Sequence, residues 1–123
     1  MISSKRAVMR ALLSTCLLGL SGFAYAAPSR QEGIASYYGA ELHGHRTASG
    51  TRFNRHALTA AHRSLPFGTR LRVVNLANGR SVVVSVNDRG PFVRRRILDV
   101  SEAAAKQLGF VGRGYTKVRI ETL

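Results

Sequence analysis

Two β-rich runs and the short turn between them constrain the fold of this chain most. The runs occupy residues 70–76 and 80–86, and Ala77-Asn78-Gly79 separates them. An Asn-Gly pair in this position predicts a β-hairpin, because both residues tolerate a positive φ. Apolar residues alternate along the second run except at Val83, so we expect that strand to be covered on both sides. This hairpin is the clearest local signal in the chain.

The other periodic segments are short. Residues 33–39 and 115–123 predict strands, and residues 59–61 predict a shorter strand after an ambiguous helical turn. Residues 40–55 are polar and predict mostly loop, and residues 66–68 predict a turn. Ser101 can cap one helix over residues 102–108, which Gly109 ends. About five or six short strands with one helix favour a closed barrel, since closure removes exposed sheet edges.

The first 26 residues have the layout of a secretory signal peptide. Lys5, Arg6 and Arg10 precede an apolar stretch over residues 11–23, and Ala24-Tyr25-Ala26 follows as a cleavage site. The apolar stretch is shorter than the roughly 20 residues that span a bilayer. We therefore expect an exported protein of the periplasm or cell envelope. Its parts would be the signal peptide at 1–26, a short flexible lead at 27–32 and one domain at 33–123.

The sole cysteine, Cys16, lies inside this apolar stretch. Leu13-Ser14-Thr15-Cys16 has a faint likeness to a lipoprotein signal. Thr15 is a poor fit, because the site before the cysteine usually takes Gly, Ala or Ser. We therefore expect Cys16 to be an apolar residue of the signal peptide rather than a lipid anchor. The exported domain would then have no disulfide and would depend on core burial alone.

The chain is strongly basic. Its formal net charge is +13, and removal of the three basic residues of the signal peptide leaves +10. Such a charge suits a polyanionic partner. Export argues against nucleic acid, so wall carboxylates, phosphate polymers and lipid headgroups are the expected anions. The alternative is that the charge only keeps a small domain soluble.

A β-branched run ends at a carboxylate in the segment Val86-Asn87-Asp88-Arg89-Gly90-Pro91-Phe92. Asp88 either closes a turn or lies at the rim of a binding cleft. As a general acid it would have to keep its proton near neutral pH, which burial against Phe92 or Val86 would favour. Arg89 would oppose this if its charge pointed inward, so we expect Arg89 to point away or to pair with Asp99.

Four further motifs occur in order around this loop. They are Gly33-x-Ala35-Ser36-x-Tyr38-Gly39, His43-Gly44-x-x-Thr47-Ala48-Ser49-Gly50, Leu58-Thr59-Ala60-Ala61-His62-x-x-Leu65-Pro66-x-Gly68-Thr69 and Ile97-Leu98-Asp99-Val100-Ser101. Together they resemble the catalytic domain of the RlpA (rare lipoprotein A) family of septal-ring lytic transglycosylases, over residues 33–121. The resemblance implies a mainly β fold, a six-stranded double-psi β-barrel with one short α-helix. It also implies that the substrate is peptidoglycan glycan strands, typically peptide-free. Many family members carry a C-terminal SPOR domain, which this sequence does not show.

The resemblance implies a site of three residues, which fall on Thr51, His62 and Asp88. The family usually has an acidic residue after Ala-Ser-Gly, and Thr51 occupies that position here. Thr51 can offer a hydroxyl group but cannot ionise. Asp88 is then the expected general acid and base, and His62 is expected to donate to a sugar or to orient Asp88. The expected substrate-binding residues are Thr51, Tyr38, Arg89 and Glu41.

The small number of acids favours a lytic over a hydrolytic route. Ordinary glycosidases use two carboxyl groups, whereas most of the six acids here lie near the chain ends or beside the expected helix. Asp99 is expected to support the start of that helix, and Glu41 is either a loop charge or a substitute for the missing acid. A lytic transglycosylase can manage with one acid, because the 6-hydroxyl of the sugar replaces water and gives a 1,6-anhydro product.

Two functions remain open. In the first, the chain is an endolytic peptidoglycan lytic transglycosylase of cell-wall remodelling that needs no cofactor. In the second, it is a non-catalytic, expansin-like glycan-binding module, which Thr51 favours. We expect a monomer that binds glycan strands and no nucleic acid, with partnership in the cell-division machinery left open. His43 and His45 alone do not predict a metal site, and Arg94-Arg95-Arg96 is either a basic patch for wall anions or a solvated loop.

Overall fold

The computed structural model describes residues 29–123, so the expected signal peptide, Cys16 included, lies outside the described residues. In chain order the elements are β1 (Arg30–Tyr37), η4 (Ala40–Leu42, a 3₁₀ helix), β2 (Thr59–Ala61), β3 (Arg70–Asn75), β4 (Ser81–Asp88), β5 (Arg96–Val100), α1 (Glu102–Leu108) and β6 (Tyr115–Thr122). Residues 30–32 are strand rather than the flexible lead expected there. These residues form a strand because their backbone pairs with β6, which is distant in the sequence; Arg30, for example, is opposite Glu121.

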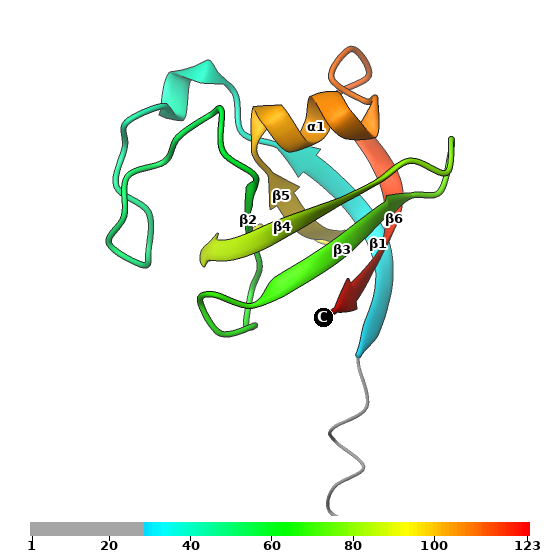
Figure 1. Ribbon diagram of the computed structural model, residues 1–123, viewed down its shortest axis with the longest axis horizontal. Coiled ribbons are helices and arrows are strands. Elements are labelled where there is room, and N and C mark those ends of the chain that lie inside the picture. The colour runs from blue at the N-terminus through cyan, green and yellow to red at the C-terminus, as the bar shows by residue number, and fades with distance from the viewer. Residues whose placement is uncertain (1–28) are drawn as a thin grey trace, which may run out of the picture.

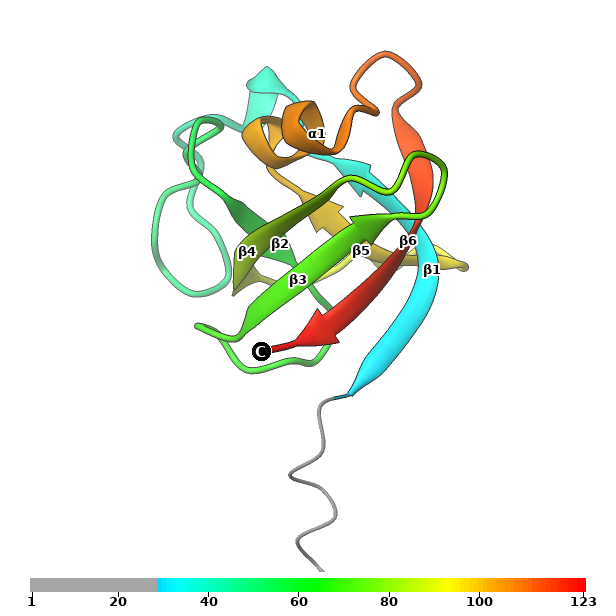
Figure 2. The same cartoon turned by 45° about the vertical axis from the view of Figure 1, so that its right-hand side comes forward.

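The six strands close into a barrel in the order β1-β5-β2-β4-β3-β6 (Figures 1 and 2). The pairs β1–β5 and β2–β4 are parallel, and the other four pairs are antiparallel. Helix α1 connects β5 to β6 and lies across one end of the barrel (Figure 1). The expected six-stranded double-psi β-barrel with one short α-helix is confirmed. Closure pairs every strand on both sides, which removes exposed sheet edges.

The barrel interior holds the apolar core. Leu71, Val84, Leu98 and Val118 are at most 1% exposed, and α1 contributes Leu108 from the covered end. Fully burying one such side chain stabilises the fold by roughly 1.5–3 kcal/mol. The described residues contain no cysteine. Core burial therefore stabilises this fold without the disulfides that stabilise many small exported domains.

The hairpin between β3 and β4 is confirmed, with a longer turn than Asn-Gly alone predicts. The backbone N–H of Gly79 donates to the carbonyl of Asn75 at 2.7 Å. Of the three turn residues 77–79, only Gly79 has a positive φ, of 80°. Asn78 instead accepts a hydrogen bond from the N–H of Arg80 through its side chain, at 2.9 Å. Val83 is half-buried, which fits a strand that is covered on both sides.

Helix α1 begins and ends where the sequence predicts. The hydroxyl of Ser101 accepts from the N–H of Ala104 at 3.2 Å, and Gly109 ends the helix with a φ of 82°. Asp99 takes no part in this cap, contrary to expectation, because its carboxyl group is bonded to Ser36 and Arg96 instead. Within residues 29–123, no helix has the length and hydropathy to cross a membrane.

Strand register brings two acids to the side of the sheet that is turned away from the core, where Ala61 and Asp99 are nevertheless buried. Ala61 of β2 is the partner of Asp88 in β4 and of Asp99 in β5, and Asp99 is the partner of Ser36 in β1. Cross-strand partners project to the same side of a sheet, and Ala60, the neighbour of Ala61, faces the core. We call Asp88, Ala61, Asp99 and Ser36 the acidic row. The long loop between β1 and β2 runs beside this face (Figure 1).

Candidate active site

The carboxyl group of Asp88 lies at the end of β4 and accepts three hydrogen bonds. Its Oδ1 accepts from the backbone N–H groups of Ala48 and Arg89, at 2.9 and 2.8 Å. Its Oδ2 accepts from the hydroxyl of Tyr38 at 2.7 Å. These partners come from three separate segments and fix the carboxyl group in one orientation. Asp88 therefore does more than close a turn.

Tyr38 follows β1 and reaches across to Asp88. Its ring packs edge-on against Phe53, with the ring centroids 4.9 Å apart. Burial raises the pKa of the Tyr38 phenol well above its ordinary value, and the hydrogen bond to Asp88 raises it further. The phenol therefore keeps its proton. A hydroxyl group both donates and accepts, so Tyr38 can remain bonded to Asp88 whether that carboxyl group is ionised or protonated.

Thr51 belongs to a cluster of three hydroxyl groups beside Asp88. The hydroxyl oxygens of Thr47, Ser49 and Thr51 lie 3.0–3.1 Å from one another, and Thr47 donates to the carbonyl of Thr51 at 2.7 Å. This loop is joined to the end of β4 by the Ala48 bond to Asp88 and by a backbone bond to the residue before Asp88. The position of the missing acid is thus filled by a hydroxyl group near Asp88.

Asp99 is a second carboxylate on the same face, and sequence reasoning missed it. Its side chain accepts hydrogen bonds from the hydroxyl of Ser36 and from Nη2 of Arg96, the latter at 2.8 Å. Asp99 and Asp88 are both strand partners of Ala61, and their negative charges both contribute to the raised pKa of Tyr38. The sequence did contain a sign that Asp99 has partners. Asp99 interrupts an apolar segment, and a charge that is buried in such a segment needs hydrogen-bond or ion-pair partners.

Arg89 points away from Asp88, as expected. Its Nη1 donates to the carbonyls of Leu65 and His62, at 2.8 and 3.3 Å. Its guanidinium carbon lies 4.0 Å from the centroid of the Phe67 ring. The alternative expectation, an ion pair with Asp99, is wrong, because another arginine bonds that carboxylate. Arg89 therefore ties the loop after β2 to the end of β4.

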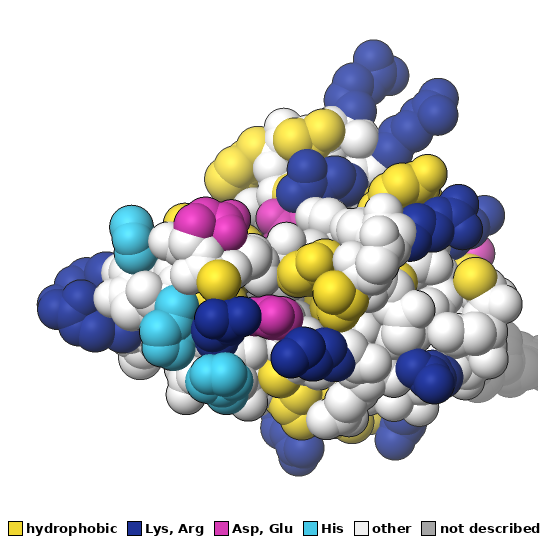
Figure 3. Space-filling view, turned by 90° about the horizontal axis from the view of Figure 1, so that it is seen from above, with side chains coloured by type: hydrophobic (Ala, Val, Ile, Leu, Met, Phe, Trp, Pro, Cys, Tyr) yellow, Lys and Arg dark blue, Asp and Glu magenta, His cyan; other side chains and the backbone are white. Residues whose placement is uncertain are grey.

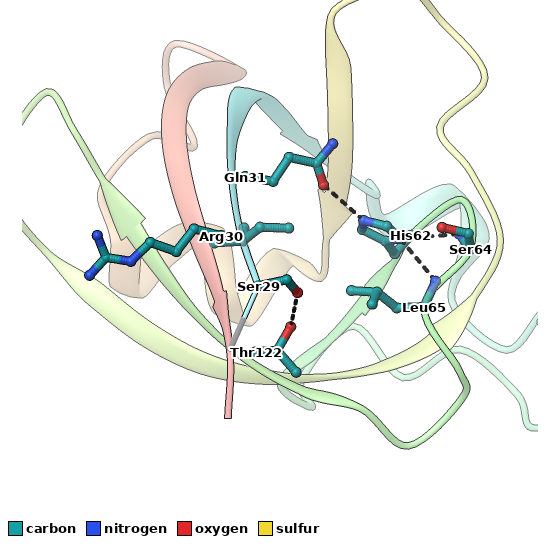
Figure 4. A pocket seen from close by; sticks show the side chains of 8 residues that line it. Ser29, Arg30, Gln31, His62, Ser64, Leu65 and Thr122 are labelled. Carbon is teal, nitrogen blue, oxygen red and sulfur yellow. Dashed lines mark hydrogen bonds between the residues drawn. The ribbon is translucent and has the colours of Figure 1, made fainter. Parts of the chain in front are cut away.

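His62 lies in a pocket of about 220 Å³ between the start of β1, the end of β6 and the loop after β2 (Figure 4). Its Nδ1 accepts from the N–H groups of Ser64 and Leu65, both at 3.1 Å, so Nε2 carries the proton and donates to Oε1 of Gln31 at 3.2 Å. The backbone N–H of His62 donates to the carbonyl of Asp88. Within the described residues, no hydrogen bond joins the His62 ring to the Asp88 carboxyl group. A catalytic role for the ring stays a prediction.

His62 gives the fold a pH dependence. Burial lowers the pKa of His62 below 6.5, and the charges of Arg89 and Arg63 lower it further. The unfolded chain therefore gains a proton near pH 6.5 while the folded chain does not, so the free energy of unfolding falls as the pH drops below 6.5. Thermal unfolding from about pH 7.5 to about pH 5 measures this loss. We expect His62→Gln to reduce the dependence of the unfolding free energy on pH. An equal dependence in His62→Gln and in the unchanged protein would contradict the assignment of this effect to His62.

Glu41 lies apart from these groups. It is exposed in η4, where its carboxyl group covers Gly39, and no hydrogen bond or ion pair joins it to Asp88. The rings of His43 and His56 pack against each other with centroids 5.8 Å apart. Over residues 29–123, no three or more His, Cys, Asp and Glu side chains gather in the way that a metal ion requires.

Basic side chains dominate the face seen in Figure 3, where Lys and Arg outnumber Asp and Glu. Ion pairs with arginine engage three of the acids, Asp99, Glu102 and Glu121. The excess of positive charge attracts polyanions to the surface. Phe92 is 77% exposed and does not bury Asp88, contrary to expectation.

Comparison with known proteins decides the family. A family model described as lytic transglycolase matches residues 30–120. The probable endolytic peptidoglycan transglycosylase RlpA of Nostoc sp. (strain PCC 7120) is 61% identical over 94 residues, which cover 75% of this chain and 25% of that protein. The endolytic peptidoglycan transglycosylase RlpA of Neisseria meningitidis serogroup A is 53% identical over 93 residues, which cover 76% of this chain and 39% of that protein. The chain belongs to the RlpA family.

This RlpA-family chain spans only 25–39% of the length of those two relatives. Two solved structures share its fold. The Streptomyces papain inhibitor has a TM-score of 0.63 at 24% identity, covering 77% of this chain and 94% of its own. The apo expansin of Clavibacter michiganensis has a TM-score of 0.63 at 22% identity, covering 77% and 50%. At these identities the likeness shows the fold alone.

Proposed function

We propose that this chain is an endolytic peptidoglycan lytic transglycosylase, which cleaves glycan strands during cell-wall remodelling in the periplasm or cell envelope. The observation that carries this proposal is the carboxyl group of Asp88, which three donors hold in place on the outward face of the barrel. The proposal includes peptide-free glycan strands as the partner and a monomer as the acting form. Any connection with the cell-division machinery belongs to the same proposal.

The bonds of Asp88 assign a role to each of its oxygens. Oδ1 already accepts from two backbone N–H groups, whereas Oδ2 accepts only from Tyr38. Oδ2 is therefore the oxygen that exchanges a proton with substrate. Tyr38 donates to this oxygen when Asp88 is ionised and can still donate to it when Asp88 is protonated, because Oδ2 keeps a lone pair, so the acidic proton is left for the substrate.

The proposed reaction has two proton transfers and consumes no water. Protonated Asp88 first gives its proton to the glycosidic oxygen, and the bond from that oxygen to C1 of the muramyl residue breaks. The Asp88 carboxylate then takes the proton of the C6 hydroxyl of the same residue, whose oxygen forms a bond to C1. The products are a strand with a 1,6-anhydromuramyl end, a second strand with a new hydroxyl group, and Asp88 protonated again.

Asp99 raises the number of carboxylates on this face to the two that an ordinary glycosidase uses. Asp99 is buried, is paired with Arg96 and accepts from Ser36, so it is poorly placed to attack C1. The lytic and hydrolytic routes leave different ends. Mass spectrometry of products from peptide-free strands therefore tests the proposal: 1,6-anhydromuramyl ends support it, and reducing ends show hydrolysis instead.

A second candidate function is a non-catalytic glycan-binding module that acts like an expansin. The hydroxyl cluster of Thr47, Ser49 and Thr51 favours it, because an acid is expected at the third position. Binding of peptide-free strands without any cleaved product would replace the enzymatic proposal with this one.

Thr51→Glu is expected to raise the rate of glycan cleavage by roughly 10²-fold, the usual gain from a placed acid or base. Thr51 is exposed, so a longer side chain has room there, and its loop is tied to Asp88 through Ala48. The measurement is the initial rate of release of anhydromuramyl ends. Thr51→Gln is the matched control, since it has the same length and cannot ionise. Equal rates in the two variants would show that an acid at position 51 does not serve this barrel.

A further inference from the structure

The loop that follows Asp88 carries an exposed tip with apolar and basic side chains. Phe92 is 77% exposed and Val93 is 53% exposed. Arg94 and Arg95 are exposed too, and no ion pair with a carboxylate engages either of them within the described residues. Arg96 differs from its two neighbours, because a carboxylate of the acidic row neutralises it. We call residues 92–95 the loop tip.

The loop tip is held rigidly. Arg63 donates from Nε to the carbonyl of Pro91 at 2.7 Å, and from Nη2 to the carbonyls of Val93 and Arg96, both at 2.8 Å. At the start of the loop, the N–H of Arg89 donates to the Asp88 carboxylate. Phe92 is four positions after Asp88, so it lies within roughly 14 Å of the proposed acid along the chain. A surface fixed in advance in this way loses little conformational entropy on binding.

The chemistry of the loop tip suits an anionic sugar. An exposed aromatic ring offers a flat apolar face, on which the apolar face of a sugar ring can pack. Arginine guanidinium groups bind carboxylates through paired hydrogen bonds. A muramyl residue without its peptide ends in a free lactyl carboxylate, whereas a muramyl residue that carries a peptide has a neutral amide at that atom.

We propose that the loop tip is a glycan subsite, in which Phe92 packs against a sugar ring and Arg94 and Arg95 bind the free lactyl carboxylate of a peptide-free muramyl residue. This inference rests on the proposed function, because it assumes that a bound glycan strand reaches Asp88. It assigns the selection of peptide-free strands to the positive charge of the loop tip, which is separate from the catalytic carboxyl group.

An anionic lipid surface is the competing occupant, since it too attracts arginine and apolar side chains. The position of the loop tip argues against it. The tip is in the same loop as Asp88, so insertion into headgroups would bring Asp88 to the bilayer and hinder a glycan strand from reaching it. A glycan strand can contact the tip and Asp88 together.

Binding measurements with soluble peptide-free strands test the subsite. All proteins carry Asp88→Asn, so that the strands stay intact, and thermal unfolding confirms that each variant is folded. We expect Phe92→Ala to bind roughly tenfold more weakly. We expect Arg94→Gln with Arg95→Gln to bind roughly fivefold more weakly. The same measurement is made on strands whose carboxylates have been converted to neutral amides. There the double arginine variant should bind as tightly as the protein that keeps both arginines, whereas Phe92→Ala should still weaken binding.

Matched controls remove the same chemistry elsewhere on the barrel. Arg72→Gln with Lys117→Gln removes two exposed charges from other strands, and Tyr115→Ala removes an aromatic side chain that is 47% exposed. Equal weakening of strand binding by the control pair and by the arginine pair would overturn the proposal in favour of general charge attraction.

Binding to vesicles of phosphatidylglycerol and phosphatidylethanolamine tests the competing lipid occupant. Loss of vesicle binding in Phe92→Ala, with strand binding intact, would overturn it in favour of a membrane contact.

The outcomes separate this inference from the proposed function. If the chain with native Asp88 cleaves strands and the loop-tip variants bind them normally, the subsite is wrong and the activity stands. If those variants bind more weakly but native Asp88 yields no cleaved product, the activity is wrong and the subsite belongs to a glycan-binding module.

Discussion

Asp88→Asn is expected to lower the rate of glycan cleavage by roughly 10³-fold, to the background of the assay, because the amide cannot give or take a proton at this position. The fold should tolerate the change. The amide oxygen still accepts from the N–H groups of Ala48 and Arg89, and the amide nitrogen can donate to the Tyr38 hydroxyl, which then accepts. Release of anhydromuramyl ends measures the activity, and circular dichroism on heating should show a nearly unchanged midpoint.

Glu32→Gln is the matched control for this change, since it also replaces a carboxylate with an amide, on an exposed residue of β1 away from the acidic row. It should leave both activity and unfolding unchanged. Cleavage at the native rate by Asp88→Asn would end the assignment of Asp88 as the acid. A midpoint that falls by many degrees would show that Asp88 acts through the fold.

Asp99→Ala is expected to destabilise the barrel by about 2–3 kcal/mol, since it removes the carboxylate that pairs with Arg96 and leaves Ser36 without its acceptor. Arg96 is only 33% exposed, and its Nε is already buried without a partner, so the unpaired guanidinium group has little access to water. For a domain of this size the loss corresponds to a fall in the unfolding midpoint of about 10 °C or more. Thermal unfolding measures it directly.

Asp99→Asn separates the structural part of this effect from the electrostatic part. The amide keeps an acceptor for Ser36 or Arg96, so its loss of stability should be smaller than that of Asp99→Ala. Activity assayed well below both midpoints then reports the contribution of the Asp99 charge to the reaction. Unfolding of Asp99→Ala at the native temperature would show that the buried pair does not stabilise this face.

The features predicted correctly are those that local chemistry decides. The hydroxyl of Ser101 and the left-handed Gly109 bound α1 because capping depends on residues within one turn of the helix. The hairpin around Gly79 formed for a similar reason, although Asn78 used its side chain rather than a positive φ. The family motifs added the topology of the barrel, which periodicity alone could not supply.

The errors fall where partners are distant in the sequence. Asp99 lies two positions before Ser101, so proximity along the chain suggested that it supports the helix start. Its actual partner Ser36 is 63 positions away and becomes a neighbour only when β1 and β5 pair in parallel. In the same way, the ring of His62 turned to Gln31 of β1, a contact that no reading of its own motif indicates.

The sequence by itself determined most of the strands, the capped helix, the positive charge and the family, because these depend on residue types, local spacing and motif order. Only the tertiary structure decided which groups meet Asp88. Barrel closure brings Tyr38, the loop before β2 and Asp99 to one face from segments that are far apart along the chain. The physical reason is register, because the pairing of β2 with both β4 and β5 fixes which side chains share that face.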